Sequence, residues 1–129
     1  MYKITKEFAF SASHQLNGLP ETHPCSRMHG HNYIIRVELK SETLNDVGFV
    51  VDYRALDDIK KFIDDVLDHQ HLNDVLPFNP TAENMAKYFY EYFNHLHSEV
   101  SAVEVCETPK TNARYVPDHN CGCGGECDC

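Results

Sequence analysis

The sequence predicts a single α+β domain, in which an antiparallel sheet is covered on one face by two helices. Its 129 residues are about the length of one domain. Segments with the two-residue period of strands and segments with the helical period are segregated along the chain, in the order β, β, β, α, α, β, β. Four of the six cysteines fall within the last nine residues, so no disulfide framework is expected across the predicted domain, residues 1–117.

Two strands are predicted in the first third of the chain. Between Tyr2 and His14, large apolar residues alternate with polar ones, and the same phase carries His14 to the face of Phe8 and Phe10. From residue 29 to residue 40, Ile34 is the one large apolar residue out of phase. One face holds the histidines and the other large apolar residues, and the opposite face is largely polar: the first set is His29, His31, Tyr33, Ile35, Val37 and Leu39.

A third strand and two helices are predicted next. Turn residues 45–48 precede a short strand at 49–51, which is expected to pair with the preceding strand as a hairpin. Asp52 can cap a helix that runs to about Leu67 and has an acidic outer face. After a loop over 68–80, a second helix begins near Pro80 or Thr81. Its apolar stripe contains Met85, Phe89, Tyr92, Phe93 and Leu96.

Two strands complete the predicted domain. In the strand from Val100 to Thr108, Val103 shares a face with Glu107. Cys106 faces the other way and is interpreted as a packing residue. Residues 113–116 are predicted as a short last strand.

Charge and hydropathy limit the partners of the protein. Twenty acidic residues against eleven basic ones give a formal net charge of −9, so a nucleic-acid partner, which needs a basic surface, is not expected. A small anionic substrate would need local cations, for which Arg27, Lys110 and Arg114 are the candidates near the motifs described below. No apolar run approaches the roughly 18 residues of a membrane span, and the N-terminus lacks a signal-peptide pattern. A cytoplasmic protein without a membrane partner is therefore expected.

Three histidines are predicted to form a metal site. The His29-Gly-His31 pair sends both imidazoles to one face of its strand, and the phase of the first strand brings His14 to a similar inward face. Three neutral imidazoles with an open fourth position are the arrangement of a catalytic zinc site.

Cys25 lies four residues before His29, and its role has two interpretations. It is either a fourth ligand that closes the metal site or a separate catalytic thiol that exchanges protons with substrate carbon. Its polar surroundings in the sequence favour chemistry over packing. A partner for such a thiol is available in Asp68-His69, where the acid can orient the imidazole, although His71 competes with His69 for this role.

The last residues, 118–129, are interpreted as a Cys-rich tail outside the domain. Two Cys-x-Cys pairs can bind soft metals such as Zn(II) or Cu(I) through thiolates. A tail of this kind would also suit a non-catalytic metal-binding protein, which is the alternative to an enzyme, and an extension without bound metal is the simplest interpretation of all. The tail cysteines are Cys121, Cys123, Cys127 and Cys129.

Five segments carry a resemblance to a known family: Cys25-Ser-Arg-Met-His29-Gly-His31-Asn-Tyr33, Gly48-Phe-Val-Val-Asp52-Tyr53, Leu67-Asp-His-x-x-Leu-Asn73, Pro80-Thr-Ala-Glu-Asn84 and Val105-Cys-Glu-Thr108. In this order and spacing they resemble the 6-pyruvoyltetrahydropterin synthase and 6-carboxytetrahydropterin synthase superfamily, over roughly residues 1–116. The resemblance implies the tunnelling fold, in which antiparallel sheets of several subunits join in a β-barrel. It also implies a homo-oligomer, commonly a homohexamer, with active sites between subunits.

The resemblance assigns roles to individual residues. The positions that match the family's zinc ligands are His14, His29 and His31. Those that match its catalytic cysteine and its acid and histidine partners are Cys25, Asp68 and His69, which decides against His71. Glu107 matches the glutamate that anchors the pterin, and Thr108 belongs to the same motif. A carboxylate can accept two hydrogen bonds from the pterin ring, as this role requires.

The substrate that the resemblance implies is 7,8-dihydroneopterin triphosphate, converted with the help of Zn2+. One branch of the superfamily eliminates triphosphate and leaves a pyruvoyl group. The other also releases acetaldehyde and leaves a 6-carboxyl group, on the route to 7-deazapurines such as queuosine. Three residues separate Cys25 from His29, a spacing that resembles the carboxy branch, and residues 48–53 resemble it as well. The expected enzyme is a 6-carboxytetrahydropterin synthase-like lyase, with the pyruvoyl reaction as the alternative.

Overall fold

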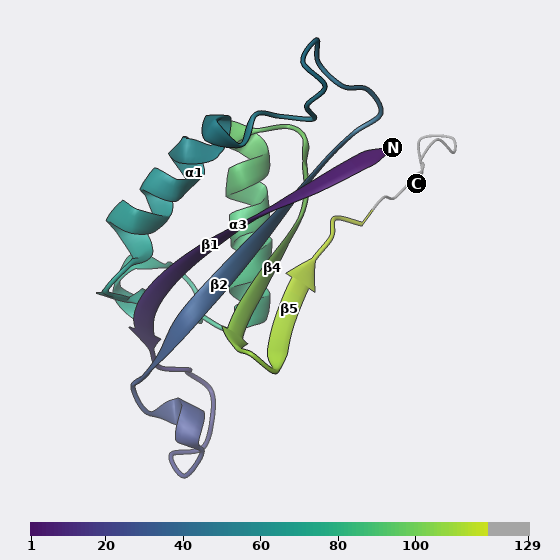
Figure 1. Ribbon diagram of the computed structural model, residues 1–129. Helices are drawn as coiled ribbons and strands as arrows, with labels where there is room; N and C mark the ends of the chain where they lie inside the picture. Colours follow the sequence, from purple (N-terminus) through teal and green to yellow (C-terminus); the bar gives the residue numbers. More distant parts are fainter. Residues whose placement is uncertain (119–129) are drawn as a thin grey trace.

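A computed structural model describes residues 1–118 of the chain. It confirms the α+β class: a five-stranded sheet has helices α1 and α3 on the same side (Figure 1). The strand order in the sheet is β3-β1-β2-β4-β5. The strands are β1 (Tyr2–His14), β2 (His29–Ser41), β3 (Gln70–His71), β4 (Val100–Thr108) and β5 (Thr111–Tyr115).

The hairpin of β1 and β2 positions most of the candidate site. Its antiparallel register runs without a shift from Tyr2 opposite Ser41 to His14 opposite His29. The predicted phase is therefore kept along both strands, because a single slip would move every side chain to the other face. The inward residues that it buries are Phe8, Phe10, Ala12, His14, Tyr33, Ile35, Val37 and Leu39.

The second predicted helix is confirmed as α3 (Ala82–Leu96). The Thr81 hydroxyl caps it by accepting a hydrogen bond from the Asn84 backbone N–H over 3.1 Å. Met85, Phe89 and Phe93 are fully buried against the sheet. Burying side chains of this size contributes roughly 1.5–3 kcal/mol each, so the apolar stripe is what holds α3 on the sheet.

The first predicted helix is divided into three pieces. A 3-10 turn, η2 (Tyr53–Leu56), is followed by α1 (Asp57–Phe62) and a π-helical turn, η3 (Ile63–Leu67). Asp52 caps the first piece as expected, since its carboxylate accepts from the Arg54 backbone N–H over 3.0 Å.

The prediction of a strand at 49–51 is wrong, because the structure has no strand there. The Asn45 side-chain oxygen accepts from three successive backbone N–H groups, those of residues 47–49, and the Asn45 N–H donates to the Phe49 carbonyl over 2.9 Å. This closed turn uses the backbone groups that a hairpin strand would have paired.

The sheet is mixed, which corrects the prediction of a purely antiparallel one. Within the predicted loop 68–80, β3 pairs in parallel with Ala12 and Ser13 of β1, and a short helix, α2 (Leu72–Val75), follows it. A further 3-10 turn, η1 (Pro24–Ser26), lies between β1 and β2. The last strand, predicted over 113–116, begins two residues earlier, at Thr111. No helix among residues 1–118 is long and apolar enough to cross a membrane.

Candidate functional site

Three histidines converge at the end of the β1–β2 hairpin. His14 is the last residue of β1, and His29 and His31 are the first and third residues of β2. One nitrogen from each ring lies within 4.8 Å of those from the other two. His14 is 1% exposed, and the other two are half-buried. The structure therefore brings together the three residues that the sequence analysis grouped.

Backbone carbonyls orient two of the imidazoles. His14 Nδ1 donates to the Pro80 carbonyl over 2.8 Å, and His29 Nδ1 donates to the Arg27 carbonyl over 2.8 Å. A carbonyl oxygen can only accept, so the proton of each neutral ring is on Nδ1 and the Nε2 lone pair is free. The buried Tyr33 hydroxyl lies 3.1 Å from the same His14 Nδ1.

This arrangement leaves two acceptors facing each other. His14 Nε2 and His29 Nε2 are 2.9 Å apart, and neither ring has a second proton to share when both are neutral. A cation between them removes the repulsion of the lone pairs. Three neutral imidazoles are a suitable donor set for a divalent metal, so the residues fit such an ion.

Burial keeps two of the three rings, those of His14 and His31, in the neutral state that binds metal. Desolvation lowers the pKa of His14 to about 4, helped by the positive charges that His29 and His31 would carry, although the Pro80 carbonyl acts in the opposite direction. Desolvation also lowers the pKa of His31. Both rings are therefore neutral near pH 7, as metal ligation requires.

Glu107 lies beside the histidines, on the inner face of β4. Its Oε2 is 3.7 Å from His14 Nε2. Desolvation raises the pKa of this carboxyl group, and the nearby Glu83 raises it further. Burial together with the Glu107 charge also raises the pKa of Tyr33. A half-buried carboxylate with few partners of its own is available to accept hydrogen bonds from a ligand.

Asp68 and His69 form the predicted pair. Asp68 Oδ2 is 2.9 Å from His69 Nδ1, while Asp68 Oδ1 accepts from the Ser11 backbone N–H over 2.9 Å. The Ser11 hydrogen bond is the main cause of the lowered pKa of Asp68. His69 has a φ of 61°, an uncommon left-handed conformation, and its N–H donates to the Ser11 carbonyl over 2.6 Å. The pair is thus anchored to β1 through both residues.

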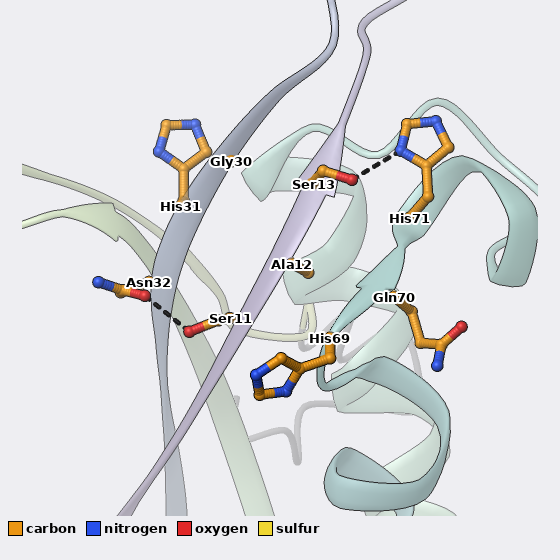
Figure 2. Close-up of a pocket in the computed structure, with 9 residues that line it drawn as sticks. All are labelled: Ser11, Ala12, Ser13, Gly30, His31, Asn32, His69, Gln70 and His71. Atoms are coloured by element: carbon orange, nitrogen blue, oxygen red, sulfur yellow. Dashed lines mark hydrogen bonds between the residues drawn. The ribbon is translucent and has the colours of Figure 1, made fainter.

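An open pocket of about 460 Å³ lies in front of this pair. Figure 2 shows His69 and His71 on either side of Gln70, with His31 across the pocket on β2. His71 Nδ1 is 2.9 Å from the Ser13 hydroxyl. Sequence reasoning compared His71 with His69 but missed this contact, because the parallel pairing of β3 with β1 has no signal in the sequence.

Cys25 belongs to neither group. It lies in η1, is half-buried, and is not among the residues that line the pocket of His69. Within the part of the chain that the structure describes, the metal-ligating cluster contains the three histidines and not the Cys25 thiol. His23, which had no predicted role, accepts the Cys25 backbone N–H at its Nδ1 over 3.1 Å.

The remaining predicted residues lie at separate places. Arg27 lines a cavity of about 400 Å³ beside the loop after β1, and Thr108 lines another, of about 350 Å³, on the helix-free face of the sheet. Arg114 is paired with Glu38 over 2.7 Å, and Lys110 is exposed in the turn after β4. The structure therefore does not gather these three cations at one point.

Cys106 and the tail complete the comparison with the sequence. Cys106 faces away from Glu107, as predicted, and its Sγ lies 3.1 Å from Arg36 Nη1 on the helix-free face. The tail cysteines Cys121, Cys123, Cys127 and Cys129 lie outside the described residues.

Comparison with known proteins identifies relatives over almost the whole described chain. The profile of the family described as 6-pyruvoyl tetrahydropterin synthase matches residues 3–118. A protein of Synechocystis sp. named 6-carboxy-5,6,7,8-tetrahydropterin synthase is 36% identical, with 89% of this chain and 93% of that protein covered. A Bacillus subtilis protein of the same name is 31% identical, with 90% and 86% covered. Among solved structures, the 6-pyruvoyl tetrahydropterin synthase of Caenorhabditis elegans superposes with a TM-score of 0.80 at 28% identity, over 91% of this chain and 96% of that one.

Proposed function

The chain belongs to the 6-pyruvoyl tetrahydropterin synthase family and is an enzyme of the lyase type, and from this premise we propose its reaction. The enzyme converts 7,8-dihydroneopterin triphosphate and water to 6-carboxy-5,6,7,8-tetrahydropterin, acetaldehyde and triphosphate, a step toward queuosine and related 7-deazapurines. The atoms balance: the three side-chain carbons become one carboxyl carbon and the two carbons of acetaldehyde, triphosphate leaves by elimination with the ester oxygen, and water supplies the third oxygen that the carboxyl group and acetaldehyde need.

One observation carries the proposal more than any other. The Nε2 atoms of His14 and His29 face each other across 2.9 Å with free lone pairs, and the Glu107 carboxylate lies 3.7 Å from the first of them. A metal site and a pterin-binding carboxylate are thereby close enough to act on one small molecule.

The proposed metal is Zn2+, with His14, His29 and His31 as its ligands. When bound, it supplies a Lewis acid that polarises the hydroxyl groups of the substrate side chain. Pro80 and Arg27 keep the two ligand rings in the tautomer that this role needs, through the hydrogen bonds already described.

The proton transfers are assigned to Cys25 and to the Asp68–His69 pair. Cys25 moves protons at the side-chain carbons, and His69 acts as its acid–base partner. Asp68 holds His69 in one orientation and stabilises the charged imidazolium. Its lowered pKa keeps it a carboxylate throughout the neutral range.

Recognition of the pterin and of its triphosphate falls to other residues. Glu107 accepts hydrogen bonds from the ring N–H and amino group of the pterin. Thr108 and Arg27 are assigned to substrate binding on their motif positions alone, and further cations are expected from neighbouring subunits.

We assign the active enzyme to a homohexamer in which each site combines residues of two subunits. In one chain Cys25 does not line the pocket in front of His69, which supports this assignment. Complementation tests it: Cys25→Ala and His69→Ala proteins are inactive alone and are mixed after dissociation. Random reassembly restores about a quarter of the wild-type activity if the two residues act across an interface. No recovery is expected if they act within one chain.

The reaction itself is tested by identifying the product with mass spectrometry. The proposal requires 6-carboxytetrahydropterin together with acetaldehyde. The pyruvoyl alternative is favoured by the likeness to the Caenorhabditis elegans structure and predicts 6-pyruvoyltetrahydropterin without acetaldehyde. That product would overturn the carboxy assignment.

A further inference from the structure

Two asparagine side chains continue the sheet beyond the end of β1. The Gln15 N–H donates to Asn73 Oδ1 over 2.8 Å, and Asn73 Nδ2 donates to the Gln15 carbonyl over 2.8 Å. Two residues later, Asn79 makes the same reciprocal pair with the Asn17 backbone, over 2.9 and 3.2 Å. Each amide therefore satisfies one N–H and one C=O of the chain, as a neighbouring strand would do.

The opposite edge of this segment is tied to Cys25. In an extended chain, successive residues direct their backbone groups to alternate edges, so Leu16 faces away from the two asparagines. Its N–H donates to the Cys25 carbonyl over 2.9 Å. Residues 15–17 thus lie between the asparagine side chains and the backbone of Cys25.

Asn79 is also connected to the histidine cluster. Asn79 precedes Pro80, whose carbonyl orients His14, and Asn84 Nδ2 holds the Asn79 carbonyl over 2.9 Å. The start of α3 therefore positions a ligand ring through Pro80 and the loop of Cys25 through Asn79.

We propose that Asn73 and Asn79 are positioning residues, which fix the place of the Cys25 thiol relative to the three histidines through residues 15–17. The idea rests on the proposed catalytic role of Cys25. It predicts that loss of either amide displaces Cys25, while the histidine cluster, held by β1, β2 and Pro80, continues to bind metal.

The test uses Asn73→Asp and Asn79→Asp, which keep the shape of the side chain and remove the N–H donor. The matched control is Asn94→Asp, because Asn94 Nδ2 also donates to backbone carbonyls, those of Ser98 and Val100, at the other end of α3. The readout is the iodoacetamide alkylation rate of Cys25, followed on its own peptide by mass spectrometry because the tail cysteines also react.

Alkylation of Cys25 is expected to become about tenfold faster in both test variants, because each loses the hydrogen bond from its amide to the backbone carbonyl and places a carboxylate oxygen against that carbonyl, which favours local opening. Under turnover, kcat falls by a similar factor with KM unchanged, and the metal content is that of the wild type. The control differs from the wild type in none of these. If Cys25 in the test variants reacts as it does in Asn94→Asp, the proposal is wrong.

Hydrogen–deuterium exchange of the wild-type protein covers the case in which a variant does not fold. The amides of residues 15–17 are expected to exchange slowly, since all three are hydrogen-bonded. Exchange at the rate of an unstructured chain would overturn the proposal without any substitution. A wild-type protein that makes no pterin product refutes the proposed function instead, and the alkylation and exchange results still decide the role of the asparagines.

Discussion

The cluster of three histidines and the proposed acid–base groups differ in how far a single chain completes them. His14, His29 and His31 point to one place, and the carbonyls that orient His14 and His29 lie within the same chain. The acid–base groups are divided between the loop of Cys25 and the corner of His69, whose side chain is 81% exposed, against 1% for His14. A buried, hydrogen-bonded cluster keeps its geometry before ligand arrives, whereas exposed groups gain theirs from a partner or a substrate.

The comparison separates two properties of the enzyme. Under the proposed function, metal binding depends on one subunit and on the β1–β2 hairpin, and turnover depends in addition on Cys25, Asp68 and His69. Substitutions in the two regions should therefore affect metal content and turnover differently.

The largest effect is expected for His14→Ala. It removes the most buried of the three ligand rings, so metal content falls to the background level and turnover falls by more than about a thousandfold. Metal is measured by atomic emission after dialysis, in a protein that lacks residues 119–129 so that tail thiolates do not contribute. His95→Ala is the control, because His95 is exposed in the last turn of α3. Full metal content in His14→Ala would contradict the proposal that the three histidines bind the metal.

Cys25→Ala is expected to separate the two regions. Turnover falls by about a thousandfold, since a positioned acid–base group typically contributes between a hundredfold and ten-thousandfold. Metal content stays at the wild-type level, because the thiol is not part of the histidine cluster. Loss of metal in this variant would make Cys25 a metal ligand and would contradict the separation of metal binding from proton transfer.

Asp68→Asn tests the Asp68–His69 pair, the other part of the proposed acid–base machinery. The amide can no longer stabilise a charged His69, so kcat is expected to fall by about a hundredfold with the metal retained. The Asn oxygen can still accept from the Ser11 N–H, which keeps the corner folded. A kcat equal to that of the wild type would show that His69 needs no orienting carboxylate.

Long periodic segments were the part of this molecule that sequence could predict. β1 and β2 extend over 13 residues each, and their alternation continues into His14, His29 and His31, so phase alone placed the three histidines together. The apolar run at 49–51 is too short to specify a strand against the turn that Asn45 closes. The two residues of β3 pair through their backbone and need no pattern of side chains.

The details of the site were less accessible to sequence reasoning. The groups that orient His14 and His29 are the carbonyls of Pro80 and Arg27, which every residue type possesses. For Cys25 the position in the sequence left two interpretations, and the family resemblance chose between them; the role predicted for Glu107 came from the resemblance. Irregular loops have no periodic pattern, so the spacing of residues in the sequence does not determine which loop groups contact each other.

Acid is expected to weaken the metal-free protein through His14. Its pKa is about 4 when folded and 6.5 when unfolded, so the unfolded chain binds more protons between these values and stability falls as pH decreases. Between pH 7 and 5 the free energy of unfolding should fall by about 2 kcal/mol, roughly a thirtyfold change in the folded-to-unfolded ratio. Urea titrations in EDTA at both pH values measure it. His14→Gln should lose most of this dependence, and an unchanged slope would contradict the burial of a neutral ring.

The smallest effect on turnover is expected from deleting residues 119–129. The family profile ends at residue 118, and the proposed metal and acid–base residues all precede the deletion, so kcat and KM should equal those of the full chain. If the four tail thiolates bind a soft metal, the full chain holds more zinc than the truncated one, which keeps only the ion at the histidines. Metal content is measured on the full and the truncated chain, each with and without His14→Ala. Metal lost with His14→Ala belongs to the histidines, and metal lost with the truncation belongs to the tail. Equal metal content in the full and truncated chains would count against a tail site. Lower turnover after truncation would mean that residues 119–129 contribute to catalysis.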